Sequence, residues 1–99
     1  MATGQRSSTV DPIDVSCNKD GQGWLCIVRV GARGGTTEHE VTVSNAELDR
    51  FAPAATEPVS LVERSFRFLL EREPKESILR RFALSEIERY FPEYPALIR

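Results

Sequence analysis

Cys17, Cys26 and His39 are the residues of this chain whose types could do chemistry together. Alternation along three extended segments places them on the same face of neighbouring strands. There, sulfur and imidazole ligands could hold zinc, or the imidazole could activate a thiolate. The same face carries Trp24 and several valines, which is where a hydrophobic core would form. We expect core residues, and a metal site stays the alternative.

The redox state of the cysteines depends on the compartment. Residues 1–10 are polar and lack the hydrophobic segment of a signal peptide. Although Cys17 and Cys26 could pair, reduced thiols are expected in a chain without an export signal. No apolar run approaches the roughly 20 residues that span a bilayer. The sequence therefore predicts a cytoplasmic protein with no membrane partner.

The other motifs do not form a catalytic site. The glycine-rich segment at residues 31–35, GARGG, links two predicted strands and does not open a helix, so it lacks the helix N-terminus of a phosphate-binding loop. Acidic residues alternate with arginines along the predicted helices, and no carboxylate pair for acid/base catalysis stands out. We predict that the protein is not an enzyme and binds no cofactor.

Three strands are predicted from residues that alternate between apolar and polar, at 13–17, 24–30 and 37–43. Turn sequences at 18–23 and 31–36 connect them as an antiparallel meander. The side chains expected on its apolar face are Ile13, Val15, Cys17, Trp24, Cys26, Val28, Val41 and Val43.

Helical patterns occupy the next part of the chain. Ser44 and Glu47 are spaced as a capping box for a short helix, and a long amphipathic helix follows from residue 58 to 71 or 72. Glu73-Pro74 then interrupts the helical pattern.

Two further helices are expected after this break. The first covers residues 75–82, with Ile78, Leu79 and Phe82 directed inward. The second covers residues 86–91 and begins at a second capping box formed by Ser85 and Glu88. The tail after it either docks on the domain or offers a short apolar ligand.

These elements predict an α+β domain in which a three-stranded antiparallel β-meander is followed by three to four helices packing on one sheet face. Residues 1–12 form a flexible leader, and residues 13–99 form a single domain. Within it, the sheet occupies 13–43, the helical part 44–91 and the tail 92–99.

Charge argues against nucleic acid as the main partner. The chain has 13 Lys and Arg against 15 Asp and Glu, so it lacks the basic excess that attracts phosphates. The helix pair at 75–91 has the outline of a helix-turn-helix, and its possible contacts are Arg80, Arg81 and Arg89. Glu86 and Glu88 would repel phosphate at the reading end, so weak nucleic-acid binding is kept as the alternative function.

A protein-interaction or regulatory module is the main functional prediction. Leu25 and Ile27 lie on the outer sheet face, and the chain end is rich in aromatic and apolar side chains. The predicted partner surface consists of Leu25, Ile27, Tyr90, Tyr94, Leu97 and Ile98. The partner is an unidentified protein or a second copy, which would bind the outer face or a sheet edge.

Residues 66–94, FRFLLEREPKESILRRFALSEIERYFPEY, resemble a C-terminal signature of short uncharacterised bacterial proteins. The segments that carry the resemblance are FLL at 68–70, REP at 72–74, SIL at 77–79 and YFPEY at 90–94. The resemblance covers less than a third of the chain. It implies a bacterial cytoplasmic setting and no activity, cofactor or binding residue.

Overall fold

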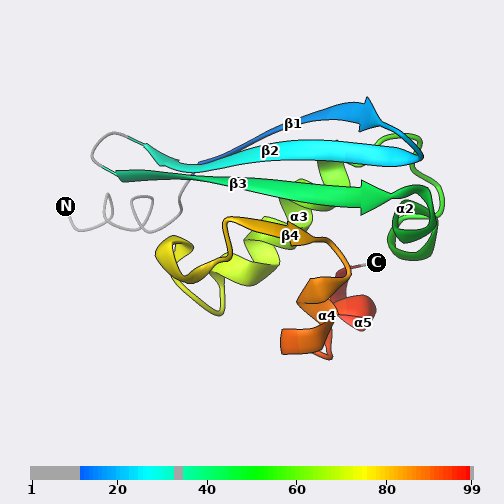
Figure 1. Ribbon diagram of the computed structural model, residues 1–99. Helices are drawn as coiled ribbons and strands as arrows, with labels where there is room; N and C mark the ends of the chain where they lie inside the picture. Colours follow the sequence, from blue (N-terminus) through cyan, green and yellow to red (C-terminus); the bar gives the residue numbers. More distant parts are fainter. Residues whose placement is uncertain (1–11, 33–34, 99) are drawn as a thin grey trace.

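The computed structural model describes residues 12–32 and 35–98 (Figure 1). The predicted leader falls outside these residues except for Pro12, whose carbonyl oxygen accepts a hydrogen bond from the Gly31 N–H at 3.0 Å.

A four-stranded sheet in the order β1-β2-β3-β4 organises the described residues. β1 (Ile13–Asp20), β2 (Gly23–Ala32) and β3 (Gly35–Ser44) are antiparallel, and β4 (Arg81–Ala83) pairs parallel to β3. The α+β class and the meander are confirmed. β4 was not predicted, and it lies in a segment that was assigned to the helical part.

The strand register confirms the predicted inner face. Cys17 pairs with Cys26 across β1 and β2, and Val28 pairs with His39 across β2 and β3. Because side chains alternate along a strand, these pairs place the predicted apolar residues on one face. The first turn is shorter than expected, since β1 and β2 extend to either side of Gly21-Gln22, where Gly21 has a φ of 62°.

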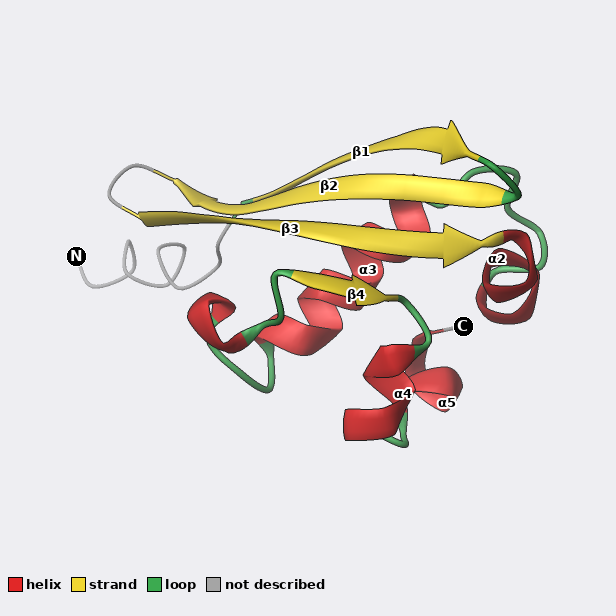
Figure 2. Ribbon diagram, in the orientation of Figure 1, coloured by secondary structure: helices red, strands yellow, loops and turns green. Residues whose placement is uncertain are grey.

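The helices cover this inner face (Figure 2). They are α2 (Asn45–Phe51), α3 (Val59–Leu70), α4 (Glu86–Tyr90) and α5 (Tyr94–Ile98), with a short 3₁₀ helix, η1 (Lys75–Ser77), after α3. α3 packs beneath β1 and also contacts α5. The core between the layers includes Cys26, Val28, Val30, Val41, Val43, Phe51, Leu61, Val62, Phe66, Leu84 and Tyr94. None of the helices in the described ranges is long and apolar enough to cross a lipid bilayer.

The capping-box prediction at Ser44 and Glu47 is confirmed. The Ser44 hydroxyl accepts the Glu47 N–H at 3.0 Å, and the Glu47 carboxylate accepts the Ser44 N–H at 2.7 Å. The second predicted capping box is wrong, because Ser85 has a helical backbone and makes no side-chain cap. The Ser85 N–H donates instead to the other oxygen of Glu47 at 2.9 Å, which ties α2 to the start of α4.

The helix predicted at residues 75–82 is also wrong. Only η1 is helical there, and the chain then becomes extended and adds β4 to the free edge of β3. The Glu40 N–H donates to the Arg80 carbonyl at 2.8 Å, and the Leu84 N–H donates to the Thr42 carbonyl at 3.0 Å. Satisfying the backbone groups of an edge strand favours this pairing over the local helical pattern.

Candidate functional site

A pocket of about 190 Å³ opens at the C-terminal end of α3. Its walls come from α3, the turn that follows, the η1–β4 segment and α4. The lining residues are Leu69, Glu73, Ser77, Ile78, Leu79, Phe82, Glu86, Ile87, Tyr90 and Phe91. We call this site the α3–α4 pocket. Its lining is mainly apolar, and its charged groups are the two carboxylates.

The side chain of His39 contacts the backbone of Leu79, a residue in the wall of the α3–α4 pocket. It is fully buried on β3, and its Nδ1 lies 2.8 Å from the Leu79 carbonyl oxygen. Its Nε2 lies 2.8 Å from the Thr37 hydroxyl. A carbonyl oxygen can only accept, so the neutral ring carries its proton on Nδ1 and accepts the Thr37 proton at Nε2.

Exposed hydrophobic side chains gather at this pocket. The large hydrophobic residues exposed in the described part of the chain are Leu79, at 47%, Tyr90, at 65%, and Leu97, at 60%. Leu79 and Tyr90 both line the α3–α4 pocket, whereas Leu97 on α5 does not. Leu79 was predicted to point inward. Leu79 lies in the non-helical segment between η1 and β4, so it does not share a face with Ile78 and Phe82 as it would on a helix.

The two carboxylates of the pocket differ in their partners. Glu86 accepts the Ala83 N–H at 3.2 Å. Glu73 has no hydrogen bond or ion pair through its side chain among the described residues. Burial raises the pKa of Glu73, as expected for a carboxylate that loses water without gaining a cation. The pocket thus combines apolar walls with an unpaired acidic group.

The structure buries some residues of the predicted partner surface and exposes others. Tyr94 and Ile98 are buried, at 0% and 4% exposure, so their assignment to a surface is wrong. The tail folds as α5 and docks on α3, which resolves the choice between docking and a free ligand. Tyr90 and Leu97 are exposed.

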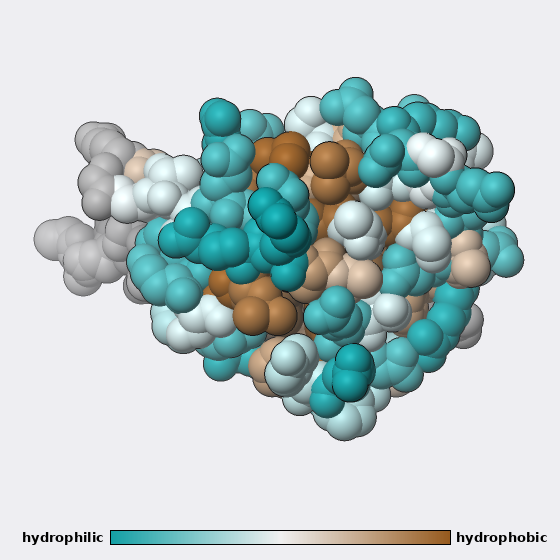
Figure 3. Space-filling view, viewed as in Figure 1, coloured by the Kyte–Doolittle hydropathy of each residue, from teal (hydrophilic) through white to brown (hydrophobic). Residues whose placement is uncertain are grey.

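The outer sheet face carries the other predicted surface residues. Leu25 and Ile27 are half-buried on β2, and Arg29 and Glu38 form an ion pair at 3.8 Å on the same face. Hydrophilic side chains border the hydrophobic surface over the middle of the sheet in Figure 3. Polar neighbours border this apolar area, and its Leu25 and Ile27 are less exposed than Leu79 and Tyr90 of the α3–α4 pocket.

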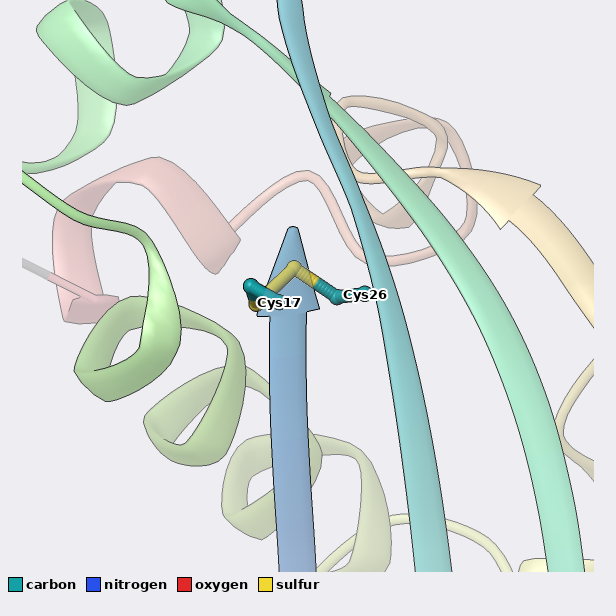
Figure 4. The surroundings of a disulfide bond; sticks show 2 residues. All are labelled: Cys17 and Cys26. Atoms are coloured by element: carbon teal, nitrogen blue, oxygen red, sulfur yellow. A yellow bond between two sulfur atoms is a disulfide. The ribbon is translucent and has the colours of Figure 1, made fainter. Parts of the chain in front are cut away.

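Cys17 and Cys26 form a disulfide that joins β1 to β2 (Figure 4). The expectation of reduced thiols is therefore wrong for this structure. The cause is their register, since the two residues face each other directly across the strands with Cα atoms 4.0 Å apart. Disulfide sulfurs are not thiolates, so they cannot serve as the predicted zinc ligands. No group of at least three potential metal ligands occurs within the described ranges.

We expect the free energy of unfolding to decrease as the pH falls below about 6.5, the usual pKa of histidine. Burial lowers the pKa of His39, and the nearby charge of Arg80 lowers it further, while the bond to Leu79 opposes this. The unfolded chain therefore binds the proton first. Between the two pKa values the slope approaches at most about 1.4 kcal/mol per pH unit.

Urea unfolding of the wild type and His39→Gln between about pH 5 and 7.5 measures this slope. His39 is the single histidine of the chain, and glutamine can still donate to Leu79 and accept from Thr37. The two proteins contain the same acidic residues, so a difference between their curves of unfolding free energy against pH is due to His39. Equal slopes would contradict the role of the neutral imidazole.

The predicted nucleic-acid contacts do not form a helix-turn-helix. Arg81 lies on β4, where its side chain pairs with Glu40 at 3.2 Å, and Arg80 precedes that strand. Arg89 lies in the last turn of α4. Because the first of the two expected helices is absent, the recognition geometry that motivated this alternative is absent as well.

Scans of this chain against protein-family models, curated proteins and solved structures found no match. Its function is therefore inferred from its own geometry.

Proposed function

We propose that this chain is a non-enzymatic protein-interaction module that receives a side chain of a partner protein in the α3–α4 pocket. The observation that carries the proposal is that Leu79 and Tyr90, two large exposed hydrophobic residues, lie on this apolar pocket. Exposed apolar surface around a concave site is typical of protein recognition, in which a few buried anchors provide most of the affinity.

The size of the pocket supports a side chain over a cofactor. Small-molecule sites commonly measure about 300–1,000 Å³. The α3–α4 pocket measures about 190 Å³, which suits one large side chain better than a whole drug-sized ligand. Its lining contains no cysteine, histidine or lysine, Glu86 is engaged by a backbone N–H, and Glu73 has no second titratable side chain hydrogen-bonded to it among the described residues. This supports binding over acid/base or nucleophilic chemistry.

The first test is selection from a random peptide display library on the folded chain. We expect the selected peptides to share a large apolar residue. The double substitution Leu79→Ser/Tyr90→Ser removes the exposed rim and should weaken their binding about tenfold or more. Both side chains are exposed, so the variant should stay folded.

Leu97→Ser is the matched control for this experiment. Leu97 is similarly exposed but does not line the pocket, so its substitution should leave peptide affinity unchanged. The proposal fails if no peptide is selected, or if the double variant and Leu97→Ser bind the selected peptides equally well.

A cytoplasmic location, predicted from the sequence, stays a prediction. The Cys17–Cys26 disulfide instead predicts an oxidising compartment, because glutathione and thioredoxin keep most cytosolic thiols reduced. Alkylation of free thiols in growing cells before lysis distinguishes the two. Two modified cysteines support the cytoplasm, and none supports an oxidising compartment.

A further inference from the structure

Glu73 differs from the other carboxylates that are partly shielded from solvent. Those with intermediate burial in the described ranges are Glu40, Glu47, Glu63, Glu73, Glu86 and Glu88. All except Glu73 have a partner, which is Arg81 for Glu40, the Ser44 and Ser85 N–H groups for Glu47, Arg67 for Glu63, the Ala83 N–H for Glu86 and Arg50 for Glu88. A partly desolvated carboxylate without a partner is unfavourable, so Glu73 is a position where a ligand could supply the missing cation.

The nearby basic side chains are held elsewhere. Arg72 stacks on the Phe68 ring, with its guanidinium carbon 3.6 Å from the ring centroid, and pairs with Glu71 and Glu93. Lys75 is mostly buried and pairs with Glu76 at 3.3 Å. Neither lines the pocket. Glu73 therefore offers an unpaired negative charge to a ligand that enters the α3–α4 pocket.

The surroundings of Glu73 indicate which cation fits. A bare metal ion needs several ligands, and no such cluster occurs in the part of the chain that the structure describes. A lysine or arginine instead carries its charge on an apolar stem, which can lie along hydrophobic walls such as Leu69 and Phe91. Its charged end can then make a charge-assisted hydrogen bond to the carboxylate.

We infer that the α3–α4 pocket recognises a basic segment of a partner protein, in which a lysine or arginine pairs with Glu73 beside a large apolar residue that packs on Leu79 and Tyr90. The inference rests on the proposed function and specifies its ligand. The basic residue that pairs with Glu73 and the apolar residue that packs on Leu79 and Tyr90 are neighbours in the same segment of the partner.

The experiment uses the peptides selected on the wild-type chain. We expect a lysine or arginine to recur at a constant spacing from the apolar residue. Glu73→Gln should weaken these peptides by about tenfold to a hundredfold, the effect of losing a charged hydrogen bond. Glu57→Gln is the matched control, since Glu57 is an exposed carboxylate outside the pocket and should have no effect.

Substitution in the peptide provides a readout that does not depend on the folding of a variant. Replacing the basic residue by methionine should weaken binding to the wild type and should have little further effect on Glu73→Gln, because the same pair is lost only once. Independent, additive losses overturn the inference.

The outcomes separate this inference from the proposed function. Peptides that lack a basic residue but lose affinity with Leu79→Ser/Tyr90→Ser support the pocket and overturn the basic ligand. Peptides that are insensitive to the double variant overturn both. Basic peptides sensitive to Glu73→Gln and to the double variant support both.

Discussion

Tyr94→Ala is expected to lower the free energy of unfolding by about 3–5 kcal/mol, the usual effect of deleting a buried aromatic ring. Tyr94 has 0% exposure, and its ring centroid lies 5.2 Å from that of Phe51 and 5.3 Å from that of Phe68, both edge-on. Small domains have total stabilities of about 5–15 kcal/mol, so this loss should leave the variant only marginally folded.

The hydroxyl of Tyr94 should account for a smaller part of this effect. The Ser65 hydroxyl donates to the Leu61 carbonyl at 2.7 Å, so the Tyr94 hydroxyl is the donor in its 2.7 Å bond to Ser65. Burial raises the pKa of Tyr94 to about 12, which keeps this proton in place at neutral pH. Tyr94→Phe removes only this bond and should lower the stability by about 1 kcal/mol.

Tyr90→Ala is the control, because Tyr90 is 65% exposed and only a few residues away. It should change the stability by no more than about 0.5 kcal/mol. Urea unfolding followed by circular dichroism measures all three variants. If Tyr94→Ala were as stable as Tyr90→Ala, α5 would not dock on α3 as described.

Three of the sequence segments noted above, FLL at 68–70, REP at 72–74 and YFPEY at 90–94, come together around this docked tail. Arg72 stacks on Phe68 and pairs with Glu93 at 3.2 Å, and the Phe68 ring also contacts those of Phe91 and Tyr94. Residues of the FLL, REP and YFPEY segments thus attach the chain end to α3. This gives the pattern a structural explanation that requires no catalytic role.

Local patterns in the sequence were sufficient to predict the meander and the first two helices. Alternation predicted the inner face by parity alone and left the register open, and the structure supplies the register. The capping box at Ser44 and Glu47 depends on residues three positions apart, so it could be recognised directly. α3 has a broad apolar stripe, which predicts a helix regardless of its partner.

The segment from Lys75 to Phe82 could not be assigned from local patterns. Its helical spacing favoured a helix, but pairing with β3 determined the structure, and the strand partners Glu40, Val41 and Thr42 are distant in sequence. Such tertiary pairing commonly overrides local propensity. The direction of Leu79, and with it the rim of the α3–α4 pocket, depends on this pairing.

The unpaired environment of Glu73 could not be predicted from the sequence for a different reason. Its neighbour Pro74 marked the break between helices, and this reading gave no reason to separate Glu73 from the many other glutamates. Helical spacing identifies pairs such as Glu63 with Arg67. It cannot identify the carboxylate that lacks a partner, because Arg72 turns to Glu93, 21 residues away.

Reduction of the Cys17–Cys26 disulfide is expected to lower the free energy of unfolding by about 2–3 kcal/mol. The two cysteines are 9 residues apart, and closing a loop of this length restricts the unfolded chain by roughly that amount. β1 is an edge strand whose sheet neighbour is β2. The disulfide therefore also fastens an edge that would otherwise rely on backbone hydrogen bonds and packing on α3.

Urea unfolding with and without a phosphine reductant measures this effect on the wild type. Cys17→Ala/Cys26→Ala is the control, and its stability should not respond to the reductant. A thiol assay on protein purified without reductant should detect no free thiol. Two free thiols, or equal stability of the oxidised and reduced wild type, would contradict the bond.

The oxidised and reduced wild-type proteins also test whether the edge of the sheet is coupled to the α3–α4 pocket. β2 and β3 lie between β1 and β4, and neither cysteine lines the α3–α4 pocket. Reduction should therefore lower stability while the folded chain keeps its affinity for the selected peptides. A loss of affinity at a urea concentration where the reduced chain is still folded would mean that β1 and the pocket are coupled through the sheet.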